Sequence, residues 1–205
     1  MPAILAKKLG MTQRFLDDGK VERVTVLEAG PCPVTGIRTH AVDGYEAVQL
    51  AFGSVREKAL TKGELGHLKK AGAPPSRHLV EFSDEAGELT VGDTVTVENF
   101  EVGQVVKIAG KGKGKGFAGT IKRHNFSAGP KSHGSHNVRA PGSIGASATP
   151  SRVFKGIRGP GRMGGKRVTQ KGLTIVELIP GENLMLVRGS VPGAKGGTVE
   201  VRTDG

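Results

Sequence analysis

Acidic residues are missing from a long internal stretch of this 205-residue chain. Residues 102–176 contain 15 of the 30 lysines and arginines but none of the 19 aspartates and glutamates. That stretch therefore carries a net charge of +15, and the remaining residues carry −4. A polycationic segment repels itself unless a polyanion neutralises it, and nucleic-acid phosphate is the commonest polyanion in a cell. The charge pattern favours a nucleic-acid-binding segment in a mildly acidic body, and a solvated, disordered segment is the alternative.

Cysteine and long apolar runs are also scarce. Cys32 is the single cysteine, which excludes an internal disulfide and is typical of a reducing compartment. No apolar run approaches membrane-spanning length, and residues 1–15 lack the apolar core of a signal peptide. We therefore expect a cytoplasmic protein that does not contact a membrane.

The sequence offers little catalytic chemistry. Two Gly-x-Gly-x-x-Gly strings begin at Gly114 and Gly159, but a chain with 33 glycines produces such matches by chance. His133 and His136, together with His124, could suggest a metal site, yet the basic segment has no cysteine or carboxylate and its charge repels a cation. We therefore expect no enzymatic activity, no cofactor and no metal.

Short stretches of strand-like sequence dominate the rest of the chain. Turn signals separate them, and Gly19 is suited to the positive φ of the first turn. One short helix is expected at residues 61–71. This pattern predicts a mainly β protein, either an antiparallel barrel or a sandwich. The expected strands are residues 3–15, 21–28, 45–52, 91–97, 105–109, 173–179, 184–191 and 198–202.

Apolar residues concentrate on both sides of the basic segment. We therefore expect residues 1–109 and 166–205 to form one globular domain, with residues 110–165 inserted as an extended arm. The arm follows neither helical nor strand periodicity, and a structureless connection of ~55 residues is far longer than usual, so it is functional or disordered. Its glycines allow the backbone to approach phosphates closely, and its arginines can grip phosphate with two nitrogens.

These properties suit crevices in folded RNA better than a DNA groove. Phe117, Phe126 and Phe154 could stack on bases, and the first two could equally pin the root of the arm to the body. The side chains expected to bind RNA are Lys111, Lys113, Lys115, Lys122, Arg123, His124, Lys131, His133, His136, Arg139, Arg152, Lys155, Arg158, Arg162, Lys166 and Arg167.

The middle of the arm is its least charged part. No charged residue occurs from Pro141 to Ser151, and small side chains there can pass between closely packed RNA elements. A plain solvent-exposed turn is the alternative. The expected tip consists of Gly142, Ser143, Ile144, Gly145, Ala146, Ser147 and Thr149.

Four strings in the sequence resemble the bacterial form of the ribosomal protein L3 family. They are ILAKKLGMTQRF at residues 4–15, GKGKGKGFAGTIKRHNFS at 110–127, GPKSHGSHNVRAPGSIGASATPSRVFKGIRGPGRMG at 129–164 and NLMLVRGSVPGAKGG at 183–197. The resemblance implies a six-stranded barrel of the kind found in translation factors and a long loop threaded through large-subunit ribosomal RNA. It also implies binding near the 3′ end of 23S rRNA, nucleation of subunit assembly, and a tip near the peptidyl-transferase centre.

The resemblance further implies a place on the ribosome beside the fourteenth and nineteenth large-subunit proteins; we expect no homo-oligomer. Some bacterial members carry a methylated glutamine directly after the PGSIG string, whereas this chain has Ala146 there. A free-standing RNA chaperone or nucleoid-type protein is the alternative function. The uncharged string 141–145 favours the ribosomal one, because loose, sequence-blind binding does not need a conformationally specific stretch at the middle of the arm.

Overall fold

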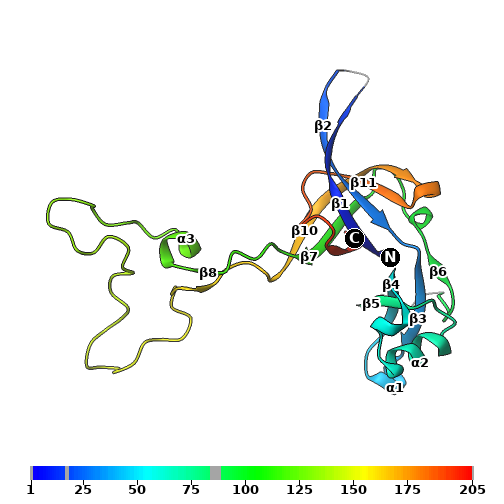
Figure 1. The fold of residues 1–205 in the computed structure, drawn as a ribbon, viewed down its shortest axis with the longest axis horizontal. Helices are drawn as coiled ribbons and strands as arrows, with labels where there is room; N and C mark the ends of the chain where they lie inside the picture. Colours follow the sequence, from blue (N-terminus) through cyan, green and yellow to red (C-terminus); the bar gives the residue numbers. More distant parts are fainter. Residues whose placement is uncertain (1, 17–18, 84–88, 205) are drawn as a thin grey trace. The chain divides into compact units, whose positions relative to one another are not determined.

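The computed structural model describes residues 2–16, 19–83 and 89–204 of the chain. These residues fold into two compact units, one made of residues 1–112 and 167–205 and the other of residues 113–166. The larger unit contains a closed barrel and a second, smaller sheet (Figure 1). None of the helices in the described ranges is long and apolar enough to cross a membrane.

Six antiparallel strands close the barrel. This confirms the six-stranded antiparallel barrel that the resemblance implies and excludes the sandwich. Closure pairs both edges of every strand, so the barrel offers no open edge to another chain. In order around the barrel, the strands are β1 (Ala3–Phe15), β12 (Thr198–Thr203), β7 (Val105–Lys111), β10 (Arg167–Ile179), β11 (Leu184–Arg188) and β2 (Val21–Ala29).

The barrel interior is filled by alternate residues of its strands. Ile4, Leu27, Ile108, Ile175 and Val201 are fully buried there, as the period of two in a strand requires. On β12, the neighbours of Val201 are the charged residues Glu200 and Arg202, which are partly exposed, whereas on β1 the neighbours of Ile4, Ala3 and Leu5, are also buried. The barrel strands therefore enclose part of a packed apolar core.

The smaller unit, residues 113–166, begins just after β7 and ends where β10 begins. These two strands are hydrogen-bonded neighbours, and the last pair in their register joins Lys111 to Arg167. The two ends of the inserted unit are thus held side by side by the barrel itself.

A four-stranded sheet in the order β5-β4-β3-β6 packs in the same unit. Only part of it was predicted, because β3 contains Pro33 and Gly36, and β5 begins with polar residues, so neither has a clear alternating pattern. The predicted strand at 91–97 contains only the two-residue β6. The strands are β3 (Cys32–Arg38), β4 (Ala47–Ser54), β5 (Ser76–Ser83) and β6 (Thr94–Val95).

The predicted helix is confirmed as α2 (Lys62–Lys70). Thr61 caps it reciprocally with Glu64: the Glu64 amide donates to the Thr61 hydroxyl (3.3 Å), and the Thr61 amide donates to the Glu64 carboxylate (2.7 Å). This capping box and the burial of Leu68 compensate for the two glycines in the helix. The other short helices of this unit are α1 (His40–Asp43), η1 (Glu57–Ala59), η2 (Val97–Asn99) and η3 (Pro180–Glu182).

Gly19 and Cys32 are two single residues that the sequence singled out. Gly19 has a φ of 77°, as predicted for the turn between β1 and β2, whereas Asp17 and Asp18 of that turn lie outside the described residues. Cys32 is fully buried at the start of β3, and burial raises the pKa of its thiol to about 12. Cys32 is therefore a small core residue and not a nucleophile.

Gly110, in β7, is a position where the barrel tolerates little additional volume. A Cβ there would lie 2.9 Å from Cγ1 of Val199 and 3.3 Å from the carbonyl oxygen of Pro192. We expect Gly110→Ala to lower the free energy of unfolding by ~1–3 kcal/mol through overpacking, measured by urea denaturation.

Gly63→Ala in α2 is the matched control, because its new methyl group meets nothing within 4 Å. Removing a glycine from the helix should raise the free energy of unfolding by ~0.5–1 kcal/mol. A Gly110→Ala variant as stable as the parent would contradict the packing described for β7 and β12.

Candidate nucleic-acid interface

The unit formed by residues 113–166, called the arm from here on, holds the whole net charge of the chain. It contains 11 lysines and arginines and no acidic residue, whereas the rest of the chain has 19 basic and 19 acidic residues and is neutral. The arm therefore cannot form an ion pair within itself. Its positive charges are neutralised only by salt or by a polyanion.

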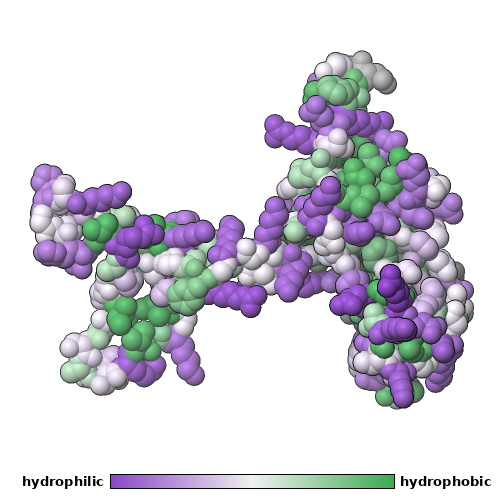
Figure 2. All heavy atoms as spheres, in the orientation of Figure 1, coloured by the Kyte–Doolittle hydropathy of each residue, from purple (hydrophilic) through white to green (hydrophobic). Residues whose placement is uncertain are grey.

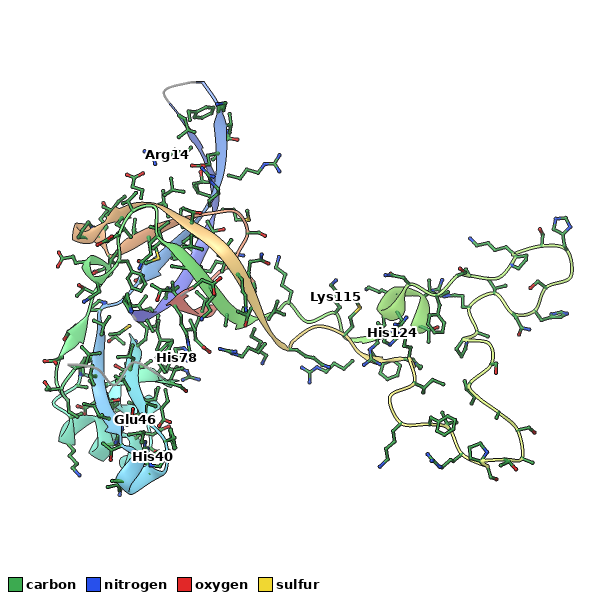
Figure 3. The ribbon with its side chains drawn as sticks, turned by 180° about the vertical axis from the view of Figure 1, so that it is seen from behind. Arg14, His40, Glu46, His78, Lys115 and His124 are labelled. Atoms are coloured by element: carbon green, nitrogen blue, oxygen red, sulfur yellow. The ribbon has the colours of Figure 1, made fainter. Side chains whose placement is uncertain are left out.

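Almost all side chains expected to bind RNA are accessible. Of the sixteen, Arg123 and His124 are half-buried and the other fourteen are exposed. Figure 2 shows hydrophilic side chains along the arm on the face that it presents, and Figure 3 shows sticks leaving the trace in several directions. An arm of this kind can contact RNA on several sides at once.

The root of the arm is folded, which corrects the expectation of a structureless segment. Strand β8 (Phe117–Ala118) pairs with β9 (Gly161–Arg162) in an antiparallel ladder. Two backbone bonds extend this ladder: the Lys115 amide donates to the Met163 carbonyl (2.9 Å), and the Met163 amide donates to the Gly116 carbonyl (2.8 Å). Sequence reasoning missed this ladder because it depends on backbone groups and has almost no apolar pattern.

A short helix, α3 (Thr120–His124), follows β8 and holds the returning chain. Nη1 of Arg123 donates to the Gly159 carbonyl (2.7 Å), and Nε2 of His124 contacts the same oxygen (3.1 Å). Because a carbonyl oxygen only accepts, Nε2 of His124 carries the proton in this contact. Both residues were predicted to bind RNA, and the structure gives them an additional role within the arm.

Beyond α3, residues 129–138 form a closed loop. The Gly129 amide donates to the Val138 carbonyl (2.9 Å). Lys131, His133 and His136 belong to this loop and are exposed to solvent. No group of three metal-binding side chains occurs in the parts of the chain that the structure describes, so the three arm histidines do not converge on a common site. His133 and His136 are exposed at the surface, whereas His124 contacts the Gly159 carbonyl within the arm.

The expected tip does not stand apart from the rest of the arm. Pro141, Ser143 and Ile144 line a hollow of about 300 Å³ together with Phe126 and Ile157. Arg158, Gly159 and Pro160 complete its wall. All residues from 141 to 150 are nevertheless exposed, so the tip is accessible to a partner.

The three arm phenylalanines differ in their surroundings. Phe117 is 79% exposed, Phe154 is half-exposed with the guanidinium of Arg152 5.1 Å from its ring centre, and Phe126 is half-buried at the hollow. An exposed ring on a cationic surface is suited to stacking on an unpaired base. Phe117 and Phe154 are the better placed for this, whereas Phe126 contributes to the arm's own packing.

Gly164 is required for the ladder at the root. Its φ is +70°, and a Cβ there would collide with the carbonyl oxygen of Lys113. We expect Gly164→Ala to break the two backbone bonds between Lys115, Gly116 and Met163, seen as faster hydrogen exchange of the Lys115 and Met163 amides. The barrel should keep its free energy of unfolding within ~0.5 kcal/mol.

Gly114→Ala is the matched control for this variant, because a Cβ at Gly114 faces open space. It should leave both exchange rates as in the parent. Unchanged exchange in Gly164→Ala as well would show that the ladder does not depend on this glycine.

Comparison with known proteins gives the same assignment over nearly the whole chain. The family model described as ribosomal protein L3 matches residues 77–183. The large ribosomal subunit protein uL3 of Gloeobacter violaceus is 54% identical over 200 residues, covering 97% of this chain and 93% of that protein. The uL3 proteins of Acidothermus cellulolyticus (54% identical; 98% and 91% covered) and Prochlorococcus marinus MIT 9515 (52%; 97% and 92%) are similarly close. The chain therefore belongs to the ribosomal protein L3 family.

Proposed function

We propose that this protein binds large-subunit ribosomal RNA through its arm and thereby orders RNA that is otherwise held apart by its own charge. As a member of the ribosomal protein L3 family, it is a structural, non-enzymatic protein of the large ribosomal subunit, bound to the ribosome in the cytoplasm. The observation that carries the proposal is the arm's charge of +11, unopposed by any acidic residue and almost entirely accessible. The free-standing RNA chaperone is set aside because the family is ribosomal.

Two kinds of contact would hold the RNA. Lys113 and Lys115 alternate with glycines, so their ammonium groups and the neighbouring amides can reach the same phosphate. Arg139, Arg152 and Arg158 are exposed and can bind phosphate with two nitrogens or stack on a base. Each such contact releases counterions from the RNA, which favours binding most strongly at low salt.

We place the protein near the 3′ end of 23S rRNA, where it nucleates subunit assembly, and direct residues 142–149 toward the peptidyl-transferase centre. Small, uncharged side chains at the tip support this, because they fit where closely packed RNA would exclude a long cation. The fourteenth and nineteenth large-subunit proteins are the proposed protein neighbours.

Salt dependence tests the role of the arm. If about ten arm cations lie on phosphates, the logarithm of the affinity for large-subunit rRNA should fall with log salt at a slope of roughly −7 to −9. Lys113→Gln or Arg139→Gln should each flatten that slope by about one unit. Lys58→Gln, at an exposed lysine outside the arm, is the control and should leave it unchanged. A parent slope near −2 would mean that the arm does not hold the RNA.

Substitution at the tip tests its placement. Ser143→Leu adds a bulky side chain at an exposed position and should leave barrel stability within ~0.5 kcal/mol. In ribosomes, the same variant should slow subunit assembly or change sensitivity to drugs that act at the peptidyl-transferase centre. Ser190→Leu, also exposed but in the barrel unit, should do neither. Ser143→Leu ribosomes that assemble and respond like the parent would rule out the placement.

A further inference from the structure

The outer face of the barrel wall carries a basic groove that the arm does not contribute to. Strand β7 lies between β12 and β10. Arg202 of β12 is opposite Lys107 of β7. Ala109 of β7 lies between Glu200 of β12 and Thr169 of β10. The alternate residues Ile108 and Val201 fill the barrel interior, so this set points outward.

The shape of the groove follows from residue size. Ala109 on β7 and its partner Thr169 on β10 have short side chains. The other residues around them have long side chains. The result is a hollow of about 340 Å³ in the barrel wall. Its lining consists of Lys107, Ala109, Arg167, Thr169, Lys171, Glu200 and Arg202.

Positive charge exceeds negative charge in this groove. Four of its lining residues are cationic and one, Glu200, is acidic. Glu200 pairs with Arg167 and lies 3.9 Å from Nη2 of Arg202, so a single carboxylate is shared between two guanidinium groups. Lys107 has a long contact of 3.9 Å with Asp204. Lys171 is exposed and forms no ion pair with the described residues.

Local structure holds two of these cations in position. Lys171 lies where the register of β10 against β7 shifts between Gln170 and Leu173, and such a bulge re-aims side chains outward. The guanidinium of Arg202 lies 4.7 Å from the ring centre of the buried Phe82, a cation–π contact that fixes its direction. The groove is thus built by the barrel and does not depend on a free loop.

We propose that this groove, defined by Lys107, Arg167, Lys171 and Arg202, is a second phosphate-binding site for ribosomal RNA. The inference rests on the proposed function, since it extends RNA binding from the arm to the barrel. RNA phosphate is favoured over an acidic protein segment because β7 and β10 continue directly into the arm at Lys111 and Arg167, so RNA bound by the arm is tethered near these strands. The neutral net charge of the barrel unit conceals this local excess.

The test compares three double variants of the full chain for binding to protein-free large-subunit rRNA over a range of salt concentrations. The groove variant is Lys107→Gln with Lys171→Gln, which leaves the pairing of Arg167, Glu200 and Arg202 intact. Lys113→Gln with Lys115→Gln changes the arm by the same charge. Lys58→Gln with Lys69→Gln is the control at two exposed lysines elsewhere in the barrel unit.

Each phosphate contact contributes ~0.7–0.9 to the slope of log affinity against log salt. Because the groove variant removes two contacts, we expect the slope to flatten by about 1.4–1.8 and binding at 0.1 M salt to weaken roughly 25- to 60-fold. Thr169→Glu, which places a carboxylate inside the hollow, should weaken binding in the same direction without removing a lysine. The control variant should bind like the parent.

The outcomes separate the two proposals. If the groove variants bind RNA like the control while the arm variant is weakened, the groove is not an RNA site and the arm's role stands. If those groove variants are also poorly retained in large subunits, the groove instead holds an acidic protein segment. If the arm variant binds like the parent, the proposed function fails, whatever the groove does.

Discussion

Mutual repulsion among the eleven cations of the arm is the constraint on which the rest of the structure depends. No acidic residue lies between residues 102 and 176 to relieve it, so the arm cannot collapse onto itself through ion pairs. It is organised by contacts that need no acidic residue. These are the backbone pairing of β8 with β9, the hydrogen bonds from Arg123 and His124 to the Gly159 carbonyl, and the residues that line the hollow at the tip. The remaining cationic surface is left for a polyanion.

The barrel makes this arrangement possible by fixing both ends of the arm. Lys111 and Arg167 are paired across β7 and β10, so the chain departs and returns at one point of the wall. Since every barrel strand has two neighbours, the core is complete without the arm. The same wall strands carry the basic groove, where the short side chain of Ala109 leaves room between long cations.

Much of the barrel was predicted from the sequence because its strands show apolar alternation, and the short helix expected at residues 61–71 is α2. Strand β3 was missed because Pro33 and Gly36 interrupt its pattern, and β10 begins at Arg167 where no apolar alternation exists. The basic character of the site was readable from composition. The contacts to the Gly159 carbonyl and the groove around Lys171 were not, because they depend on backbone atoms and on cross-strand register.

Replacing residues 113–166 by a short glycine–serine link tests the central claim most directly, because the pairing of Lys111 with Arg167 keeps the two ends adjacent. The measurement is the salt dependence of rRNA binding by the folded, shortened chain. We predict an intact barrel that has lost the arm's contribution of roughly −7 to −9 to the slope of log affinity against log salt, leaving roughly −2 to −3 from the groove alone. A shortened chain that folds and retains the parent slope would contradict it.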